Sequence, residues 1–506
     1  MIAAVGVVAR LRQLTAGRSL WLDETFVALD LQQQTLMESL IDGSPRNQLA
    51  PAGFWAVSHA AETVSSAEWV LRAFPFVGGL VLVALAVVYA ERHLASVAAR
   101  VLLVATVAWS PVLVHYAAEL KQYGLEATVS MAAAFAIAAR DRIGTTGRVG
   151  LGLLFLSLSM PALLLVPLLG LMWLADEVAQ HGTGPAIRRL ALPGTVLAVG
   201  QVGLLAYALR VEPDMMQGFW VDAFAPLPTS GSALRWWVES AVGAGDLALL
   251  SSGIASHEIR GDIFSFAPVA VATALWALVV GGGLVAWRRR DPGRRSPAAR
   301  AWWAVVPAIA LIATAFVAAA LTDLYPLRGR LLIHAVPLLF VAAAHGLDLL
   351  VDAARGDGSS EGRAATVLVG TAGAVAAIAG LIGVGGVIGS PSRQYDSRAA
   401  LSWIAERHQP GESIIYSRES VHLYDFYGPQ VGLGILPELY ADPLLDGDAL
   451  VRQAGDTPSW YFNGFIREDQ GHLPFIEQMA EHPGVVDVLW ADGTVAFFID
   501  PAAAPG

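Results

Sequence analysis

The sequence predicts a polytopic α-helical membrane protein with a small α/β domain at its C-terminus. Three observations predict this fold class. Of the 506 residues, 55 % are hydrophobic and only 15 % are charged, a composition that soluble domains rarely have. Several apolar stretches reach the roughly 20 residues needed to cross the hydrocarbon core of a bilayer. Beyond residue 390 the composition becomes mixed polar with short periodic apolar segments, which is typical of a folded domain outside the membrane.

Charge and cysteine content exclude several classes of function. The formal net charge of −11 argues against general binding of nucleic acid, which depends on a basic surface. The absence of cysteine excludes disulfides, thiolate metal sites and thiol nucleophiles. Among the 32 basic residues only Lys121 is a lysine, so this position departs from the arginine that the chain uses elsewhere.

The apolar stretches predict about 10–11 transmembrane or re-entrant helices. Met1–Ala9 supplies only nine apolar residues before Arg10, which predicts a truncated first membrane helix. The stretch 149–174 contains Pro161 and predicts two short helices, or a re-entrant pair, that bend at Ser159-Met160-Pro161. Further spans are expected near 69–90, 101–116, 123–139, 190–209, 265–286, 301–321, 331–351 and 365–389.

Arginine predicts the orientation of the chain in the cytoplasmic (plasma) membrane. Five connecting segments with 61 residues in total hold 15 arginines, whereas the other 445 residues hold 17 basic groups. This bias is typical of cytoplasmic loops. The five segments are 91–100, 140–148, 175–189, 287–300 and 352–364. With these loops inside, the first loop, the long loop 210–264 and everything beyond residue 389 are expected outside.

Three domains follow along the chain. Residues 1–67 contain the truncated helix and the first outer loop, 68–389 form the membrane domain, and 390–506 form the extracytoplasmic α/β domain. In the last, we expect a helix over 397–408 and a strand over 413–416. The segments 485–490 and 494–499 predict a hairpin around Ala491-Asp492-Gly493.

The first outer loop contains two adjacent carboxylates. Residues 19–24 read Ser-Leu-Trp-Leu-Asp-Glu. In a structural interpretation, Trp21 anchors the loop at the interface and Asp23 is the N-cap of a helix from Glu24 to about Leu40. In a functional one, a carboxylate at the lipid–water boundary is a general base that faces the head group of a lipid-linked substrate.

The second outer connection, residues 116–123, contains Lys121 on a very short loop. A lysine that snorkels at the end of a helix is common and is the structural alternative. The combination of a cation with a glutamate and tyrosines favours binding of an anionic head group instead. Candidate substrate contacts here are Tyr116, Glu119 and Tyr123.

The third outer segment, residues 323–330, carries Arg328 and Arg330 on the side where the charge bias expects few arginines. Planar guanidinium groups bind phosphate oxygens in pairs, so these residues predict a phosphate site. Anchoring to lipid head groups is the alternative. Tyr325 in the same segment is a further candidate substrate contact.

The long outer loop 210–264 contains Trp220 and Arg235-Trp236-Trp237, a combination typical of an interfacial helix. In the same loop, His257 and Glu258 are candidate ligands for a divalent metal ion. One histidine beside one glutamate is a weak metal pattern, so the sequence establishes no cofactor.

Taken together, these segments resemble the polytopic glycosyltransferases of the GT-C fold. The resemblance is to glycosyltransferase family 39, with the protein O-mannosyltransferases and the aminoarabinose lipid A transferase, and to the RgtA/B/C/D-like proteins. It runs from about Arg10 to Leu347 and more loosely beyond. It departs at Leu49-Ala50-Pro51, where many relatives have His-Pro-Pro, which argues against an acceptor or metal role there. The segments that carry it are SLWLDE at 19–24, APAGFW at 50–55, EWVLRAFPFVGG at 68–79, YAAELKQYGLEA at 116–127 and LYPLRGRLLIHAVPLL at 324–339.

The resemblance implies an enzyme that moves a sugar from a polyprenyl-phosphate donor to an acceptor hydroxyl on the outer face of the membrane. Such enzymes take an acidic base from the first outer loop, which corresponds to Asp23, with Glu24 beside it. Cations from later loops bind the donor phosphate and correspond to Lys121 and Arg330. The acceptor would be a glycan, lipid or protein of the cell envelope, and membrane lipids are further partners.

Two other classes of function stay open from the sequence, a membrane transporter and a noncatalytic scaffold. A membrane transporter would place its ionisable residues near the bilayer midplane and show broken helices in matching halves. A noncatalytic envelope scaffold would need no clustered outer charges. Convergence of Asp23, Lys121 and Arg330 on one outward cavity would favour the enzyme.

Overall fold

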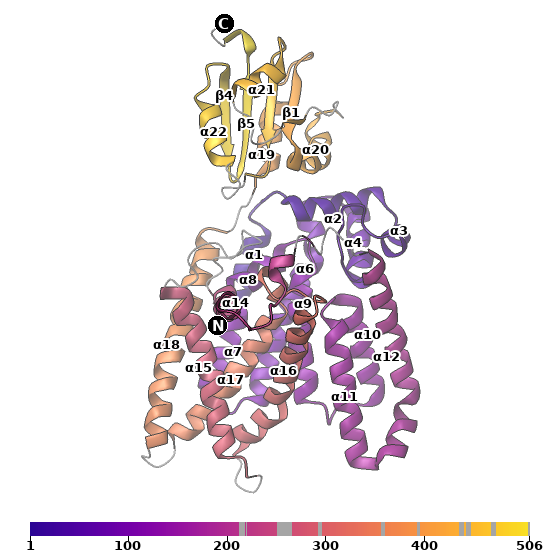
Figure 1. The fold of residues 1–506 in the computed structure, drawn as a ribbon, viewed down its shortest axis with the longest axis vertical. Coiled ribbons are helices and arrows are strands. Elements are labelled where there is room, and N and C mark those ends of the chain that lie inside the picture. Colours follow the sequence, from indigo (N-terminus) through magenta and orange to yellow (C-terminus); the bar gives the residue numbers. More distant parts are fainter. Residues whose placement is uncertain are drawn as a thin grey trace. The chain divides into compact units, whose positions relative to one another are not determined.

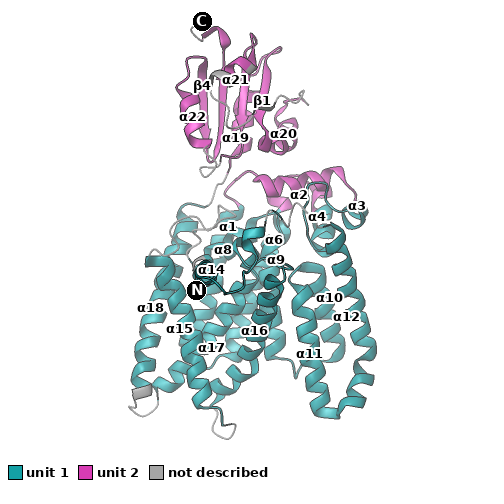
Figure 2. Cartoon of the chain, in the orientation of Figure 1, with its two compact units in different colours: residues 1–14, 36–60, 72–391 teal, residues 15–35, 61–71, 392–506 magenta. Residues whose placement is uncertain are grey.

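The computed structural model divides the chain into two compact units (Figures 1 and 2). Unit 1 comprises Met1–Leu14, Leu36–Ala60 and Arg72–Pro391, and unit 2 comprises Thr15–Thr35, Ala61–Leu71 and Ser392–Gly506. Unit 2 thus combines the C-terminal region with two pieces of the predicted first outer loop. The structure describes residues 1–211, 218, 220–249, 266–291, 296–355, 360–391, 395–434, 440–441, 447–466 and 472–503.

Unit 1 is helical. Its shorter helices are α1 (Ile2–Leu14), α3 (Leu36–Ile41), α7 (Val97–Trp109), α8 (Pro111–His115), α9 (Tyr123–Ala138) and α10 (Thr145–Leu158), and α4 (Ala52–Val64) begins in this unit. Its longer helices are α6 (Ala73–His93), α11 (Ala162–His181), α12 (Thr183–Val211), α14 (Gly231–Leu249), α15 (Phe266–Arg288), α16 (Pro297–Leu321), α17 (Ala335–Ala354) and α18 (Ser360–Gly389). Short 3₁₀ turns are η1 (Tyr116–Ala118), η2 (Val221–Ala223) and η4 (Gly329–Leu332).

Seven helices in the described part of the chain are long and apolar enough to cross a membrane. The helices α7 and α8 form an eighth candidate span that bends by 50°, and α9 and α10 are shorter apolar helices. The predicted fold class, a multi-pass helical membrane protein, is therefore confirmed. The seven are α6, α11, α12, α15, α16, α17 and the Gly362–Gly389 part of α18.

Two breaks in the membrane helices have clear local causes. The predicted bend at Ser159-Met160-Pro161 is confirmed, because α10 ends at Leu158 and α11 begins at Ala162. Proline has no N–H to donate, so Pro161 suits a helix start. The second break, between α7 and α8, was not predicted. The Ser110 side chain there caps the new helix by accepting from Leu113 N–H, and Pro111 occupies its first turn.

The membrane span predicted over 331–351 begins earlier in the sequence than the helix that the structure has there. Residues Gly329–Leu332 form a 3₁₀ turn, and the helix begins only at Ala335. The apolar residues of 331–334 extended the predicted helix because hydropathy does not register a tight turn. Arg330 consequently lies in a turn ahead of the span, at its mouth.

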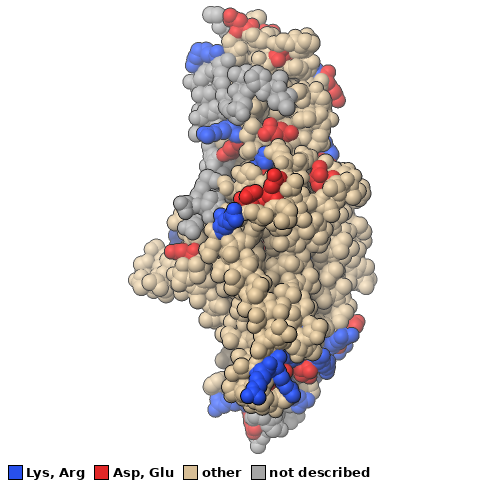
Figure 3. All heavy atoms as spheres, turned by 90° about the vertical axis from the view of Figure 1, so that its right-hand side faces the viewer, with Lys and Arg blue, Asp and Glu red and all other residues tan. Residues whose placement is uncertain are grey.

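The arginine-rich connections share one end of unit 1. The start of α12 lies at the same end as the starts of α16 and α18, drawn at the bottom of Figure 1. The face shown in Figure 3 has a band of uncharged residues over the helices and a group of arginines at that end. This arrangement agrees with connections that share one side of a membrane.

The first helix, α1, packs against α6, α7 and α18. Its Arg10 is fully buried and donates to the carbonyl oxygens of Ala108 (2.8 Å) and Val107 (3.1 Å). These carbonyls lie in the last turn of α7, where no further helical N–H is available to satisfy them. Arg10 thus stabilises the break before α8, although the 13 residues of α1 are fewer than a full span requires.

Unit 2 contains a five-stranded sheet in the order β2-β1-β3-β5-β4. The strands β1 and β3 are parallel, whereas β5 is antiparallel to both β3 and β4. Its core includes Ile415, Tyr461 and Phe497. The strands are β1 (Ser413–Ser417), β2 (Tyr440–Ala441), β3 (Ser459–Asn463), β4 (Val485–Ala491) and β5 (Thr494–Ile499). The helices are α2 (Leu22–Gln33), α5 (Glu68–Leu71), α19 (Ser397–Ala405), α20 (Val421–Tyr427), α21 (Gly447–Ala454) and α22 (His472–Ala480).

The predicted helix, strand and hairpin of this domain are present. In the hairpin, Ala491 pairs with Thr494, so the turn itself is Asp492-Gly493. The central strand β3 was not predicted. Every residue of Ser459–Asn463 is buried, so the strand lacks the alternation of polar and apolar residues that marks a half-exposed strand.

Candidate functional site

The carboxylates Asp23 and Glu24 lie in the first turn of α2, in unit 2. The prediction that Asp23 is the N-cap is wrong, because the helix begins at Leu22, two residues before the predicted start at Glu24, and Trp21 occupies the cap position. Glu24 instead accepts a hydrogen bond from Trp21 N–H at 3.3 Å. The predicted helix to Leu40 also ends early, at Gln33, before the separate helix α3.

The two carboxylates differ in burial. Glu24 is fully buried and lies 3.5 Å from a guanidinium nitrogen of Arg18, whose side chain is also buried. Breaking a buried ion pair leaves an uncompensated charge and typically costs about 3–5 kcal/mol, so Glu24 holds the start of α2 in place. Asp23 is half-buried, so it is the more exposed of the two residues.

Hydrogen bonds from the C-terminal region hold the loop ahead of α2. Ser19 Oγ donates to Asp396 Oδ1 at 2.9 Å and accepts from Arg398 N–H at 3.1 Å. The Arg398 guanidinium donates to Gly17 O at 2.8 Å. Residues 17–19 are therefore fixed at the start of α19, almost 380 positions further along the chain.

A tyrosine and a glutamate complete this attachment. The hydroxyl of the buried Tyr427 accepts from Leu20 N–H at 2.5 Å and donates to Glu68 Oε1 at 3.2 Å. Glu68 in turn pairs with Arg398 at 2.8 Å. We call Glu68, Asp396, Arg398 and Tyr427 the loop clamp. This attachment was not predicted, because polar pairs so far apart in the sequence leave no local pattern.

The loop clamp lies at one edge of the sheet of unit 2. The parallel strands β1 and β3 end at Ser417 and Asn463, and Ser397 Oγ donates to Gly464 O at 3.4 Å beside the end of β3. Asp396 N–H donates to Asp492 O at the adjoining hairpin turn. In open α/β sheets the carboxyl ends of parallel strands are where ligands usually bind. Here the segment that carries Asp23 is attached at this edge.

Residues 116–123 of unit 1, which we call the lysine loop, are buried and include several polar side chains. Lys121 is 4 % exposed and donates from Nζ to Gln48 Oε1. The neighbouring Gln122 donates from Nε2 to Leu49 O at 3.0 Å, so residues 48–49 lie over this loop. A lysine that snorkels to solvent would be exposed, so the burial of Lys121 argues against that alternative. Sequence reasoning missed Gln48 because one glutamine in a long loop is not distinctive.

Glu119 lies on the same loop but is paired. Its Oε2 is 3.0 Å from His115 Nε2, and both side chains are buried. A carboxylate engaged in this way stabilises the turn between α8 and α9. Its predicted role as a direct substrate contact has no further support from its surroundings.

Arg330, two tyrosines and a tryptophan gather near the lysine loop. The guanidinium of Arg330 lies 5.6 Å from the ring centres of both Tyr123 and Trp220, within the range of cation–π contacts. Tyr116 packs edge-to-face on Tyr123 at 5.4 Å. Four of the residues predicted for the site, Tyr116, Lys121, Tyr123 and Arg330, thus belong to one local group, which we call the cation group.

Tyr325 adjoins the cation group. Its hydroxyl donates to Leu331 O at 3.1 Å. Burial raises the pKa of Tyr325 well above its usual value of 10.0, and the nearby ionisable groups of Glu126 and Tyr123 raise it further. Tyr325 therefore stays protonated and acts as a hydrogen-bond donor at physiological pH.

Arg328 points to a different set of residues. It pairs with Glu239 at 2.9 Å and lies 4.9 Å from the ring centre of Trp236. Glu239 also pairs with Arg235 at 2.7 Å. Arg328 thus attaches the 323–330 segment to α14, the helix that contains the predicted Arg235-Trp236-Trp237 motif. Its surroundings differ from those of Arg330.

The predicted metal ligands His257 and Glu258 lie outside the described residues. Among residues that the structure describes, no group of three or more histidine, aspartate or glutamate side chains has the proximity to hold a metal ion. Asp23 belongs to unit 2 and the cation group to unit 1 (Figure 2). Their convergence on one cavity stays a prediction.

Comparison with solved structures finds similar chains. One is the apo crystal structure of ArnT from Cupriavidus metallidurans, which matches with a TM-score of 0.47 and 14 % sequence identity. The match covers 100 % of this chain and 98 % of that chain. The same protein bound to undecaprenyl phosphate gives a TM-score of 0.48 with equal identity and coverage. No protein-family profile and no curated protein sequence matches the chain.

Proposed function

We propose that the protein is a membrane glycosyltransferase that moves a sugar from a polyprenyl-phosphate donor to an acceptor hydroxyl at the outer face of the cytoplasmic membrane. The observation that carries this proposal is the cation group. It combines a buried lysine and a half-buried arginine with aromatic rings at the ends of membrane helices, where a lipid-linked phosphate would present its head group.

Lys121 and Arg330 suit the phosphate of the donor. Lys121 is buried and Arg330 is half-buried, and electrostatic interactions are stronger in such partly dehydrated surroundings than in water. Arg330 presents the planar fork that matches phosphate oxygens, and Lys121 supplies a compact charge. Arg328 has a supporting role in this proposal, because it is already engaged in an ion pair with Glu239.

The reaction is a direct displacement at the anomeric carbon. Asp23 takes the proton of the acceptor hydroxyl as that oxygen bonds to the anomeric carbon. The bond between this carbon and the phosphate oxygen breaks, and the lipid phosphate leaves with the bonding electron pair. The configuration at the anomeric carbon is inverted. Lys121 and Arg330 stabilise the charge that grows on the departing phosphate, and Tyr116, Tyr123 and Tyr325 contact the sugar or the phosphate.

Asp23 is the better candidate base of the two adjacent carboxylates. Glu24 is buried against Arg18, whereas Asp23 is half-buried at the start of α2. A positioned base of this kind typically contributes about 10²–10⁴-fold to a rate. The acceptor, in our proposal, is a glycan, lipid or protein of the cell envelope.

The proposal can be tested with purified protein in liposomes that contain polyprenyl-phosphate sugars with a radioactive label on the sugar. We expect label to move from the lipid fraction to an added envelope acceptor, with one polyprenyl phosphate released per sugar transferred. Movement of intact labelled lipid or free solute across the vesicle, without cleavage, would instead indicate a transporter. Neither transfer nor transport over a panel of hexose and pentose donors would favour a scaffold.

A further inference from the structure

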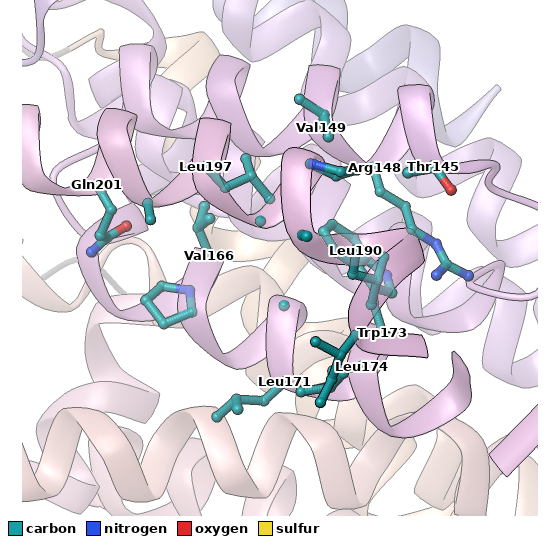
Figure 4. Close-up of a pocket in the computed structure, with 17 residues that line it drawn as sticks. Thr145, Arg148, Val149, Val166, Leu171, Trp173, Leu174, Leu190, Leu197 and Gln201 are labelled. Atoms are coloured by element: carbon teal, nitrogen blue, oxygen red, sulfur yellow. The ribbon is translucent and has the colours of Figure 1, made fainter. Parts of the chain in front are cut away.

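Unit 1 contains a cavity of about 560 Å³ among α10, α11 and α12, apart from the residues discussed so far (Figure 4). Its volume is in the range typical of small-molecule sites. The lining is almost entirely apolar. Besides the indole of Trp173, its polar side chains are Thr145, Arg148 and Gln201. Figure 4 shows Thr145 and Arg148 together at one end and Gln201 at the other.

Small residues keep this cavity open toward the bilayer. Gly170 on α11 and Gly194 on α12 both line it, and a Cβ atom at either position would meet no other atom within 4 Å. The most apolar window of α12 is only 6 % buried inside the protein. An apolar chain can therefore reach the cavity from the membrane without passing through water.

One end of the cavity has more arginines than acidic residues around it. Arg148 is held there by hydrogen bonds to Ile143 O and Arg140 O, both at 2.9 Å, and by an ion pair with Glu177 at 3.7 Å. The exposed Arg142 and Arg188 are close in sequence to the lining residues Thr145 and Ile187. The adjoining segments 140–148 and 175–189 together hold five arginines against three acidic residues.

We propose that this cavity binds an acyl chain of an anionic phospholipid from the leaflet on the arginine-rich side of the membrane, with the phosphate at Arg142 and Arg188. An apolar channel that ends in a net positive rim is complementary to an anionic lipid, and a zwitterionic lipid gains less from the arginines. The inference is independent of the proposed transfer reaction.

The site is separate from the cation group of unit 1. Lys121 precedes α9 and Arg140 follows it, and a helix of this length spans about 24 Å. The cavity therefore lies toward the opposite end of the membrane helices from the residues assigned to the donor phosphate. A donor lipid with its phosphate at Lys121 would leave this rim unoccupied.

The test uses the purified full-length protein in mixed micelles with phosphatidylglycerol that carries a photoreactive diazirine on one acyl chain. Peptide mapping by mass spectrometry then locates the labelled residues. We expect labelling to concentrate on the cavity-facing residues of α11 and α12. In Gly170→Leu and Gly194→Leu, where the new side chain fills the cavity, this labelling should fall several-fold.

Gly203→Leu is the matched control. Gly203 also lies on α12 with no atom within 4 Å of an added Cβ, but it is not a lining residue, so labelling should equal that of the parent. Labelling spread evenly around the lipid-facing helices, or unchanged in Gly194→Leu, would mean annular lipid only and would overturn the proposal.

A second arm tests the head group. Arg142→Gln and Arg188→Gln should each weaken labelling by phosphatidylglycerol by about five-fold at low salt, and should leave labelling by a matched phosphatidylcholine probe unchanged. Equal labelling by the two lipids in the parent protein would overturn the requirement for an anionic head group. Displacement of the probe by polyprenyl phosphate at lower concentration than by phosphatidylglycerol would assign the cavity to the donor instead.

Discussion

The cation group and the segment that carries Asp23 differ in what holds them. Lys121, Tyr123 and Arg330 are positioned by the ends of neighbouring membrane helices and by contacts within unit 1. The Asp23 segment is positioned by the loop clamp, whose residues Asp396, Arg398 and Tyr427 come from the end of the chain. Changes in the C-terminal domain should therefore affect the proposed base and spare the donor phosphate site.

The largest expected effect concerns the side of the membrane on which the C-terminal domain lies. Both regions can act on one substrate only if the C-terminal domain is extracytoplasmic. Because the chain has no cysteine, single cysteines can be introduced and labelled cleanly. In intact cells an impermeant thiol reagent should label Glu406→Cys and should reach Arg355→Cys only after permeabilisation. The reverse pattern would place the C-terminal domain and the proposed base in the cytoplasm and would overturn a reaction at the outer face.

The next largest effect is expected at Asp23. Replacement by asparagine keeps the size and the polarity of the side chain but removes its ability to accept a proton. The structure makes this change mild for the fold, since Trp21 and not Asp23 is at the cap position. The loss of a charge near a helix start costs about 1 kcal/mol or less. Sugar transfer should fall by about 10²–10⁴-fold with donor binding unchanged.

The control for Asp23→Asn must be a carboxylate without a buried partner. Glu24→Gln is unsuitable because it would leave Arg18 without its partner in the buried pair. Asp42→Asn is better matched, since Asp42 is 63 % exposed and lies in the same predicted outer loop. Near-parental transfer by Asp23→Asn, at equal protein amounts, would remove the residue from the mechanism.

The contrast between the two regions also separates what the sequence could predict from what it could not. Membrane helices and the break at Pro161 were predictable because each depends on a continuous stretch of residues. Tyr116, Tyr123 and Lys121 were found together for the same reason. The loop clamp depends on contacts between residues about 380 positions apart, and the cap position of α2 depends on the geometry of one turn. Neither leaves a periodic or compositional signal.

Lys121→Met tests the cation group with a somewhat smaller expected effect. Methionine keeps much of the apolar stem but has no charge, so kcat should fall by about 10²–10³-fold, as when one preorganised donor is removed. Lys121→Arg should retain part of the activity. Gln48→Leu is the control, because it removes the hydrogen-bond partner of Lys121 and leaves the charge. If Gln48→Leu and Lys121→Met lose equal activity, Lys121 serves only to hold the loop.

Tyr427→Phe tests the loop clamp. The change leaves the buried Leu20 N–H without its acceptor, which costs about 1–3 kcal/mol. We expect faster hydrogen exchange at residues 17–24 and a drop of about ten-fold in kcat, with the donor KM unchanged because unit 1 is untouched. Tyr424→Phe is the control, since its hydroxyl donates to Gly434 O within the C-terminal domain. A rise in donor KM for Tyr427→Phe would contradict the separation of the two regions.

The smallest effect is expected at Glu239, which distinguishes Arg328 from Arg330. Hydrogen bonds from Arg235 and then Arg328 lower the pKa of Glu239 below its usual value of 4.5. A carboxylate whose pKa is lowered by folding stabilises the protein above the unfolded value and loses that contribution as pH falls through the folded value. The melting temperature of the parent should therefore drop more steeply below pH 4.5 than that of Glu239→Gln. At pH 7 the variant should lose about 1 kcal/mol or less of folding stability, because the pair is partly exposed.

The donor KM of Glu239→Gln should equal that of the parent, since the pair attaches α14 and leaves the phosphate to Lys121 and Arg330. A clear change in donor KM would instead place Arg328 at the phosphate.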